Sequence, residues 1–474
     1  MNYDYVIVGG GPCGLTLATY LSKMNKKICL VEKENSLGGC NRVLRVNGLF
    51  SEHGPRVYSG AYLNFMSVLK DINLNFFNLF TPYYFNILST TKGEITSFKI
   101  VEILIITLYF LTLNEKYKLL TMDKFMEKHS FSKKTKNNLD LMCRLTCGAG
   151  SDKTTIYKFL KLIDNNIFYK FYQPKKPLDI SLFNYWEQYL TLKNVNIIKG
   201  VTVEQLYTNN NIIYSVKLSN NKIIIGDNVI LSLPPYSISK ILSNNLETID
   251  AFGPFEKFNK WVNDTNYITY IPIIFHWDSK ILNNGYSISS KWGKPQGDWG
   301  IYHIVLSNYM DFNDDRSTLV ISTAITRTDA KSEFTKKTAN QTSDKKELID
   351  EVFRQIKLIH KDLPNPSYSI LNQNYYDETN LKWIPNDTSF VETISGTMDF
   401  KSIKYKNLYM CGTQNGKSNF EITTMETAIT NALALANTLE PYLRINIKSP
   451  SMLSTYIKGF YAIMFVGILK YFIN

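Results

Sequence analysis

The chain opens with a hydrophobic run, a group of glycines and a helical pattern. Residues Tyr3–Val8 are apolar enough for a buried parallel strand, and Leu15–Asn25 repeats its apolar positions with helical spacing. A second short apolar run, Lys27–Val31, ends at Glu32. Strand, helix and strand in this order predict a βαβ unit at the N-terminus.

The glycines between the first strand and the helix have the spacing GxGxxG at Gly9, Gly11 and Gly14. Gly9 allows a tight turn, Gly11 lets the backbone approach a pyrophosphate, and Gly14 lets helix and strand pack closely. Glu32 follows at about the 20 residues that the motif requires, and its carboxylate suits ribose hydroxyls without a 2′-phosphate. The order of these parts favours a dinucleotide site over a merely structural glycine-rich turn.

Elsewhere the pattern is less specific. Residues 195–235 indicate a hairpin-rich β segment, and Ser317–Thr326 a further strand. Ile268–Trp277 also predicts a strand, in which Pro272 favours an edge position or a bulge. Ile100–Leu113 is apolar but too short to span a membrane. A buried helix is favoured there over a helix lying on a membrane surface.

The C-terminal stretch Met452–Ile473 is apolar apart from Lys458 and Lys470. As a helix it would measure about 33 Å, enough to cross a bilayer if both lysines reach outward. A tail anchor is favoured, and an interfacial helix and a core helix remain open. Arg444 and Lys448 suit a body held on the cytosolic side of an anionic leaflet.

Composition narrows the class of protein. The chain has 474 residues, a net charge of +12 and six cysteines. This length suggests two to four domains, and the hydrophobic content of 44% excludes a disordered chain. No nucleic-acid-binding signature accompanies the positive charge, and Cys143 and Cys147 lack the spacing of a metal site. We therefore expect a globular protein of a reducing compartment, without a metal or a nucleic-acid partner.

The residues after Glu32 indicate which dinucleotide the site would bind. Gly38-Gly39 and Arg42 follow it, and the whole segment resembles the extended FAD fingerprint of the flavin amine oxidase and phytoene desaturase superfamily. The glycine pair lets the backbone pass close to a ligand, and Arg42 offers a planar fork of donors to a pyrophosphate.

Phe50–Arg56 is similar to the turn that this superfamily places beside the isoalloxazine ring. The resemblance implies that His53 and Arg56 face the flavin or the substrate, so they are the candidate catalytic residues. A loop-packing role is the alternative for both.

Two later segments complete the resemblance. Val203 lies in a strand similar to the one whose backbone contacts the adenine. Gly412, Thr413 and Met425 belong to a strand, turn and helix that resemble the closing motif, in which a helix N-terminus faces the flavin pyrimidine. This chain departs from the motif at Thr413, where an acid is usual, and at Thr427, where glycine is usual.

The expected fold class is α/β, an FAD-binding Rossmann-like domain, doubly wound from βαβ units, with an inserted α+β substrate domain. The predicted FAD-binding parts are 1–75, 195–240 and 396–445, the substrate parts are 76–194 and 241–395, and the tail is 446–474.

The resemblance implies an FAD-dependent oxidoreductase that transfers hydride from a C–N or C–C bond of a small or lipid-like substrate. The superfamily often has a lysine near flavin N5, and no lysine can be assigned to that position. A UDP-galactopyranose mutase-like flavoenzyme is the second interpretation. The third is a non-enzymatic lipid-escort protein of the same fold, and the intact glycines and Glu32 argue against it.

Overall fold

A mixed sheet built from three distant parts of the chain forms the centre of the molecule. The computed structural model describes residues 2–83, 98–267, 269–282, 293–386, 389–393 and 395–460. The strand order is β8-β2-β1-β11-β10-β9, and β21 also pairs with β11. The strands are β1 (Asn2–Val8), β2 (Ile28–Val31), β8 (Asn196–Ile198), β9 (Val203–Asn209), β10 (Ile212–Leu218), β11 (Ile223–Leu231) and β21 (Leu408–Met410).

The pairing around β1 is parallel, as the apolar runs predicted. β1 pairs in parallel with β2 and β11, β2 with β8, and β11 with β21, whereas β9, β10 and β11 form antiparallel hairpins. All four residues of β2 are buried, as in a strand covered on both faces. The predicted α/β fold with a Rossmann-like parallel core is confirmed. The division into domains at the stated boundaries stays a prediction.

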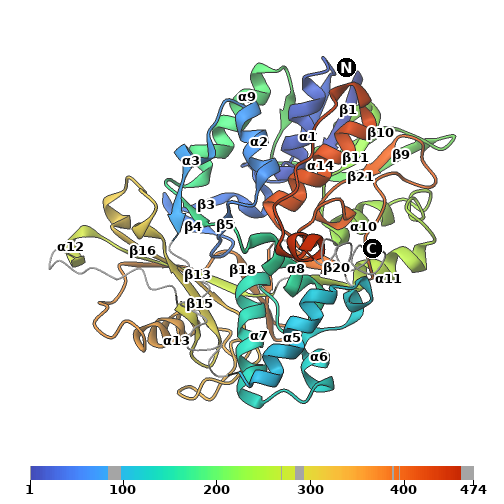
Figure 1. Cartoon of the computed structure of the whole chain (residues 1–474). Helices are drawn as coiled ribbons and strands as arrows, with labels where there is room; N and C mark the ends of the chain where they lie inside the picture. The colour runs from blue at the N-terminus through green and yellow to red at the C-terminus, as the bar shows by residue number, and fades with distance from the viewer. Residues whose placement is uncertain are drawn as a thin grey trace, which may run out of the picture.

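Helices from three parts of the sequence cover one face of this sheet. They are α1 (Pro12–Ser22), α14 (Met425–Leu439) and α9 (Asn184–Leu192), and α2 (Leu63–Asp71) packs on α14. Figure 1 shows α1 and α14 side by side although more than 400 residues separate them along the chain. The indole Nε1 of Trp186 in α9 donates to Thr19 Oγ1 of α1 at 2.8 Å, so α9 is also fixed to this layer.

A second sheet lies beside the first in Figure 1. Its order is β14-β15-β16-β13-β17. The strands are β13 (Ile271–Trp277), β14 (Gly293–Gln296), β15 (Ile301–Val305), β16 (Leu319–Ile325) and β17 (Tyr368–Ile370), and α13 (Lys345–Lys357) packs on them.

The prediction of an edge position for Pro272 is wrong, because β13 lies between β16 and β17 and is buried throughout. The ladder between β13 and β17 covers only Ile274–His276. Pro272 precedes that ladder, so a central strand accepts it without losing a hydrogen bond to β17.

The prediction of a buried helix over Ile100–Leu113 is also wrong. Helices α5 (Ile100–Thr112), α6 (Met122–Lys128), α7 (Lys133–Cys147) and α8 (Ile156–Asn166) form a helical unit. In α5 only Glu102 and Tyr109 are buried. Four large apolar side chains of this helix are more than half exposed, those of Ile100, Val101, Leu104 and Leu108. The sequence pattern missed this because α5 is apolar nearly all round, which is typical of a core helix.

Smaller elements connect these layers. The strands are β3 (Val43–Val46), β4 (Leu49–Glu52), β5 (Tyr58–Ser59), β6 (Phe80–Tyr83), β7 (Phe171–Pro174), β12 (Thr265–Tyr267), β18 (Asn374–Asp377), β19 (Lys382–Pro385) and β20 (Phe390–Thr393). The helices are α3 (Phe76–Leu79), α10 (Pro235–Ser243), α11 (Phe255–Asn263) and α12 (Ser279–Leu282).

Within the described ranges, no helix has the length and apolar character needed to cross a membrane. The predicted tail anchor falls mostly on residues 461–474, which lie outside the described residues.

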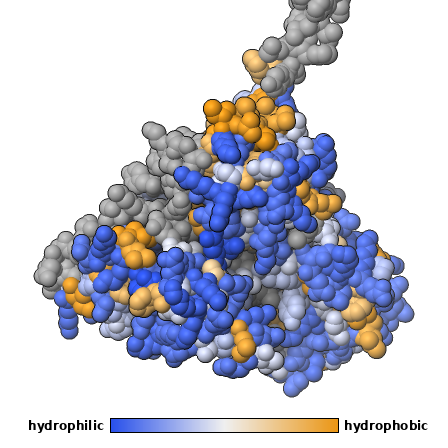
Figure 2. All heavy atoms as spheres, turned by 90° about the horizontal axis from the view of Figure 1, so that it is seen from below, coloured by the Kyte–Doolittle hydropathy of each residue, from blue (hydrophilic) through white to orange (hydrophobic). Residues whose placement is uncertain are grey.

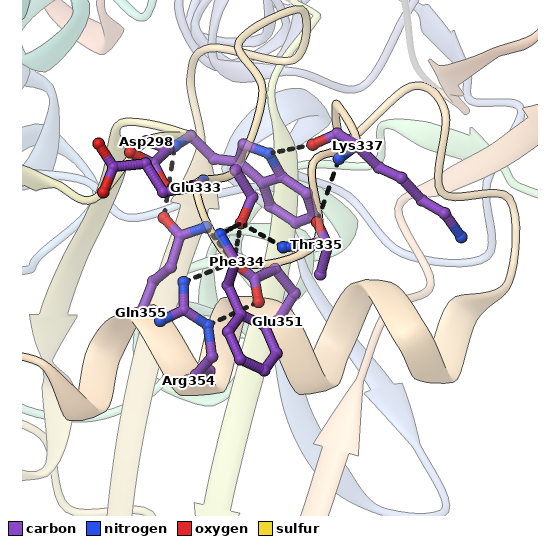
Figure 3. Close-up of polar contacts among 10 residues, drawn as sticks. Asp298, Glu333, Phe334, Thr335, Lys337, Glu351, Arg354 and Gln355 are labelled. Atoms are coloured by element: carbon purple, nitrogen blue, oxygen red, sulfur yellow. Dashed lines mark hydrogen bonds and ion pairs between the residues drawn. The ribbon is translucent and has the colours of Figure 1, made fainter.

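A buried carboxylate fixes α13 to the loop that follows β16 (Figure 3). Glu351 accepts hydrogen bonds from Ser332 Oγ at 2.7 Å, from Gln355 Nε2 at 2.8 Å, and from Arg354 through Nε at 2.7 Å and Nη2 at 2.8 Å. Burial raises the pKa of Glu351, but these donors outweigh it and hold the pKa below the usual value. The carboxylate is therefore a structural anion that ties helix to loop.

We predict that Glu351→Gln lowers the free energy of unfolding by about 1–3 kcal/mol, because it weakens several charge-assisted hydrogen bonds in a buried site. The ionised carboxylate stabilises the fold at neutral pH, and this contribution is lost as the pH falls through the folded-state pKa. Denaturant unfolding of wild type and variant should therefore differ at pH 7 and converge under acid. Asp350→Asn, which removes an exposed pair with Lys346 on the same helix, should leave unfolding unchanged. Equal losses in both variants would contradict a special role for Glu351.

Candidate functional site

A cavity of about 1050 Å³ extends from the loop between β1 and α1 to the second sheet. This volume lies just above the range of about 300–1,000 Å³ usual for ligand pockets. The predicted site residues that line it are Gly9, Gly11, Glu32, Gly39, Arg42, His53, Arg56, Val203, Gly412, Thr413 and Met425. The predicted residues Gly14 and Gly38 lie outside this lining. The structure therefore gathers residues from three distant segments around one space.

The glycines allow several backbones to meet at one end of the cavity. A Cβ at Gly14 would lie 2.0 Å from the carbonyl oxygen of Gly9, so only glycine lets α1 begin this close to β1. Gly39 has a φ of +53°, and a Cβ there would lie 3.0 Å from the Cα of Gly11. The two glycine segments thus pack against each other and leave their backbones at the cavity wall.

Glu32 holds the first glycine segment in place. Its Oε2 accepts a hydrogen bond from the backbone N–H of Gly10 at 2.6 Å, and its Oε1 accepts one from the backbone N–H of Glu34 at 3.0 Å. Burial raises the pKa of Glu32, and the two backbone donors and Arg42 oppose that effect. The carboxylate also lines the cavity, where its remaining lone pairs can accept from ribose hydroxyls.

Arg42 is buried behind the second glycine segment. Its Nη1 donates to the carbonyl oxygen of Gly39 at 3.3 Å, and its Nη2 lies 3.6 Å from Glu34 Oε1. It therefore supplies positive charge to the wall of the cavity beside the glycines, where a pyrophosphate would need it.

The N-terminus of α14 forms another part of the wall. Thr424 caps the helix, since its Oγ1 accepts from the backbone N–H of Thr427 at 3.0 Å. The buried Glu426 accepts from the backbone N–H groups of Asn64 and Phe65 at 2.9 and 2.8 Å, which ties α14 to the start of α2. Burial raises the pKa of Glu426 to about 7, against the effect of these donors. Thr424 and Met425 line the cavity, and the helix dipole at this end suits a ligand that carries negative charge.

A hydrogen-bonded chain of side chains lines the cavity directly after the second glycine segment. Cys40 Sγ lies 3.0 Å from Ser389 Oγ, which lies 2.8 Å from His53 Nε2. The ring of Tyr270 lies against His53 with 5.6 Å between the centroids. This arrangement can hold or move a proton next to a bound molecule.

Arg56 lies beside this chain, close to a buried carboxyl group. Glu52 accepts a hydrogen bond from Ser322 Oγ at 2.6 Å. Burial raises the pKa of Glu52 to about 7, although Arg56 and Ser322 lower it. The same burial raises the pKa of Tyr270 to about 12, against the effect of Arg56. A partly neutral acid and a cation therefore share this part of the site.

Several lining residues were not predicted from the sequence. Cys40 follows Gly38-Gly39 directly, so its position in the motif could have indicated it. Ser389, Tyr270 and Arg144 lie in segments with no recognisable motif, and only the fold brings them to the cavity.

Comparison with known proteins agrees with this geometry. Residues 7–72 match the NAD(P)-binding Rossmann-like domain. A stretch of 79 residues is 33% identical to the UDP-galactopyranose mutase of Mycoplasma genitalium (strain ATCC 33530 / DSM 19775 / NCTC 10195 / G37), but the match covers only 15% of this chain and 19% of the mutase.

Solved structures resemble nearly the whole chain. An oxidoreductase from Methanosarcina mazei has a TM-score of 0.64 and 14% identity, covering 92% of this chain and 99% of that structure. A putrescine oxidase solved with putrescine bound has a TM-score of 0.64 and 12% identity, covering 93% and 99%. The chain therefore shares its overall fold with these oxidoreductase and oxidase structures.

We predict that Glu32→Ala weakens FAD binding on the order of tenfold to a hundredfold, since a lost charge-assisted hydrogen bond costs roughly 1.5–3 kcal/mol. The dissociation constant can be measured by reconstituting apoprotein and following flavin fluorescence. Glu256→Ala removes an exposed carboxylate in α11, outside the cavity lining, and should have little effect. An unchanged dissociation constant for Glu32→Ala would mean that Glu32 does not bind the ribose.

Proposed function

We propose that the protein is an FAD-dependent oxidoreductase of the amine oxidase and desaturase type. The observation that carries the proposal is the single cavity that joins the glycine loop and Glu32 to the N-terminus of α14 and then to a polar, aromatic end. A dinucleotide needs the first two features, and a substrate beside a flavin needs the third.

The residues of the first part of the cavity fit FAD. Gly9, Gly11 and Arg42 would hold the pyrophosphate, Glu32 the ribose, and Val203 the adenine. The N-terminus of α14 and its neighbours Gly412 and Thr413 would face the flavin, where the helix dipole favours negative charge.

Bound FAD would supply the redox chemistry, accepting hydride from a C–N or C–C bond of the substrate. The chain's own residues would position the substrate and handle protons. His53, linked through Ser389 to Cys40, is the group best placed to hold or accept a proton. The aromatic walls, including Tyr270 and Tyr302, would exclude water from the reacting bond.

The described part of this cavity differs from an amine oxidase in one respect. Among the described lining residues the lysines are Lys33 and Lys240, beside β2 and in α10, both at the nucleotide end. The lysine that the superfamily often places near the flavin has no counterpart among them. This favours a dehydrogenation that does not depend on a lysine.

The mutase-like interpretation keeps some support from the short match to UDP-galactopyranose mutase. One experiment separates it from an oxidoreductase. Purified protein is mixed anaerobically with polyamines, aromatic amines, polyenes and nucleotide sugars, and the flavin absorbance is followed. Bleaching by an amine or polyene supports the oxidoreductase, whereas turnover of a nucleotide sugar only after chemical reduction of the flavin supports the mutase.

We predict that the purified protein is yellow and holds FAD non-covalently. Acid precipitation should release the flavin into the supernatant, where its absorbance and fluorescence identify it. Cys411, the cysteine directly before Gly412 at the cavity wall, is fully buried, so we expect no covalent bond from it to the flavin. Colour retained in the pellet would contradict the non-covalent bond, and a colourless protein that cannot be reconstituted would contradict the proposed cofactor.

We also propose that the C-terminal segment attaches the protein to a membrane. The last described residues end in exposed Tyr456 and Phe460. Figure 2 shows hydrophobic side chains gathered on the side of the molecule where the described chain ends. Helix α5 also exposes large apolar side chains, which suit contact with acyl chains.

The start of this segment belongs to the folded body. The Asp164 carboxylate in α8 accepts from Ser454 through Oγ at 2.5 Å and through the backbone N–H at 2.8 Å, and both residues are buried. A truncation before Ser454 would leave this carboxylate without these donors, so the segment should be shortened after Phe460.

We predict that a chain ending at Phe460 stays yellow and loses membrane attachment, while the full-length protein pellets with membranes at high salt. Salt screens surface electrostatics but not hydrophobic insertion. Sedimentation with vesicles, together with flavin absorbance, measures both properties. Extraction of the full-length protein by salt would contradict insertion, and loss of flavin from the shortened chain would place the segment in the core.

A further inference from the structure

The part of the cavity beside the second sheet holds two guanidinium groups, those of Arg56 and Arg144. Arg144 Nη1 donates to the carbonyl oxygen of Thr326, directly after β16, and Arg56 lies close to Glu52, which is bonded to Ser322 of β16. The acidic residues that line the described cavity are Glu32 and Glu204, beside β2 and in β9. Beside the second sheet, therefore, no described lining residue is acidic.

The guanidinium group of Arg56 has a donor nitrogen that meets no acceptor. Its Nη2 is buried and has no hydrogen-bond partner, and the side chain keeps partial exposure and lines the cavity. Glu52 lies close to it, but burial raises the pKa of this carboxyl to about 7. At neutral pH Glu52 therefore neutralises Arg56 only in part, and an unpaired donor on a buried cation is costly.

Arg144 also contributes positive charge to this part of the cavity. Its Nε donates to Asp140 Oδ2 at 2.8 Å, and Arg327 Nη2 donates to the same oxygen at 2.8 Å. Burial raises the pKa of Asp140, but Arg144 and the other donors outweigh it and lower the pKa to about 2. One carboxylate is thus shared by two guanidinium groups, which leaves positive charge beside the cavity.

We propose that this end of the cavity binds a carboxylate or phosphate group of the substrate, with Arg56 as its main donor. This inference rests on the proposed function and names the substrate class of the same site. The planar guanidinium fork matches an oxyacid, and the anion supplies the partner that Arg56 Nη2 lacks. A substrate that is only a cationic amine would meet repulsion here.

The test uses the yellow holoprotein and isosteric aromatic probes, because Tyr270, Tyr302 and Phe390 provide room and contact for a ring. Benzoate, neutral benzamide and cationic benzamidine differ mainly in charge. Their dissociation constants follow from the perturbation of flavin absorbance, without any turnover. Benzoate should bind at least on the order of tenfold more tightly than the other two.

Variants test whether Arg56 causes the preference for benzoate over benzamide and benzamidine. Arg56→Met should abolish it, Arg56→Lys should keep part of it, and Arg45→Met, which alters a surface pair with Asp179, should keep all of it. If Arg56→Met fails to fold, the benzoate preference of Arg56→Lys is compared with that of wild type. A lysine keeps the positive charge but loses the planar fork of donors, so the preference should fall in this variant. Phenyl phosphate then tells a carboxylate site from a phosphate site by its affinity relative to benzoate.

Equal or tighter binding of benzamidine, no binding of benzoate, or a preference for benzoate that both Arg56 variants retain in full would overturn the inference. A different result would contradict the proposed function. A protein that cannot be loaded with FAD contradicts the cofactor, whereas a yellow protein without a preference for anions contradicts only the anion site.

Discussion

Close contact between backbones at Gly14 and Gly39 is the constraint on which the site depends. A single Cβ at Gly14 would lie 2.0 Å from the carbonyl oxygen of Gly9, and one at Gly39 would lie 3.0 Å from Gly11. Because these backbones touch, α1 starts close to the carboxyl end of β1, and its first residues line the cavity. Glu32 then fixes the loop through the N–H of Gly10. The same crowding that shapes the loop therefore also exposes its N–H groups to a ligand.

The cavity has two chemically different ends. At the nucleotide end, Glu32 offers acceptors, and glycine backbones and a helix N-terminus offer donors. Between the second glycine segment and the second sheet, His53, Ser389 and Cys40 form a hydrogen-bonded chain beside the guanidinium group of Arg56. The first end agrees with the match of residues 7–72 to the NAD(P)-binding Rossmann-like domain. The second end would determine the substrate specificity of this protein, because fold alone does not determine the chemistry of a site.

The sequence predicted those parts of the structure that depend on local pattern. The strand, glycine loop and helix at the N-terminus, and the helix starting at Met425, are encoded by spacing within short segments. Ser389 could not be predicted, since it meets His53 from 336 residues away and lies in a segment without a motif. Hydrophobic pattern also failed for α5, whose exposure is set by what packs on it, and for Pro272, whose place in the sheet depends on the length of β17.

The central claim is that the cavity is built for a flavin dinucleotide. Calorimetric titration of the apoprotein with FAD, FMN and NAD tests it most directly. The account predicts one tightly bound FAD per chain, and much weaker FMN, because FMN lacks the adenosine half that Glu32 and β9 would hold. Binding of NAD without binding of FAD would contradict it.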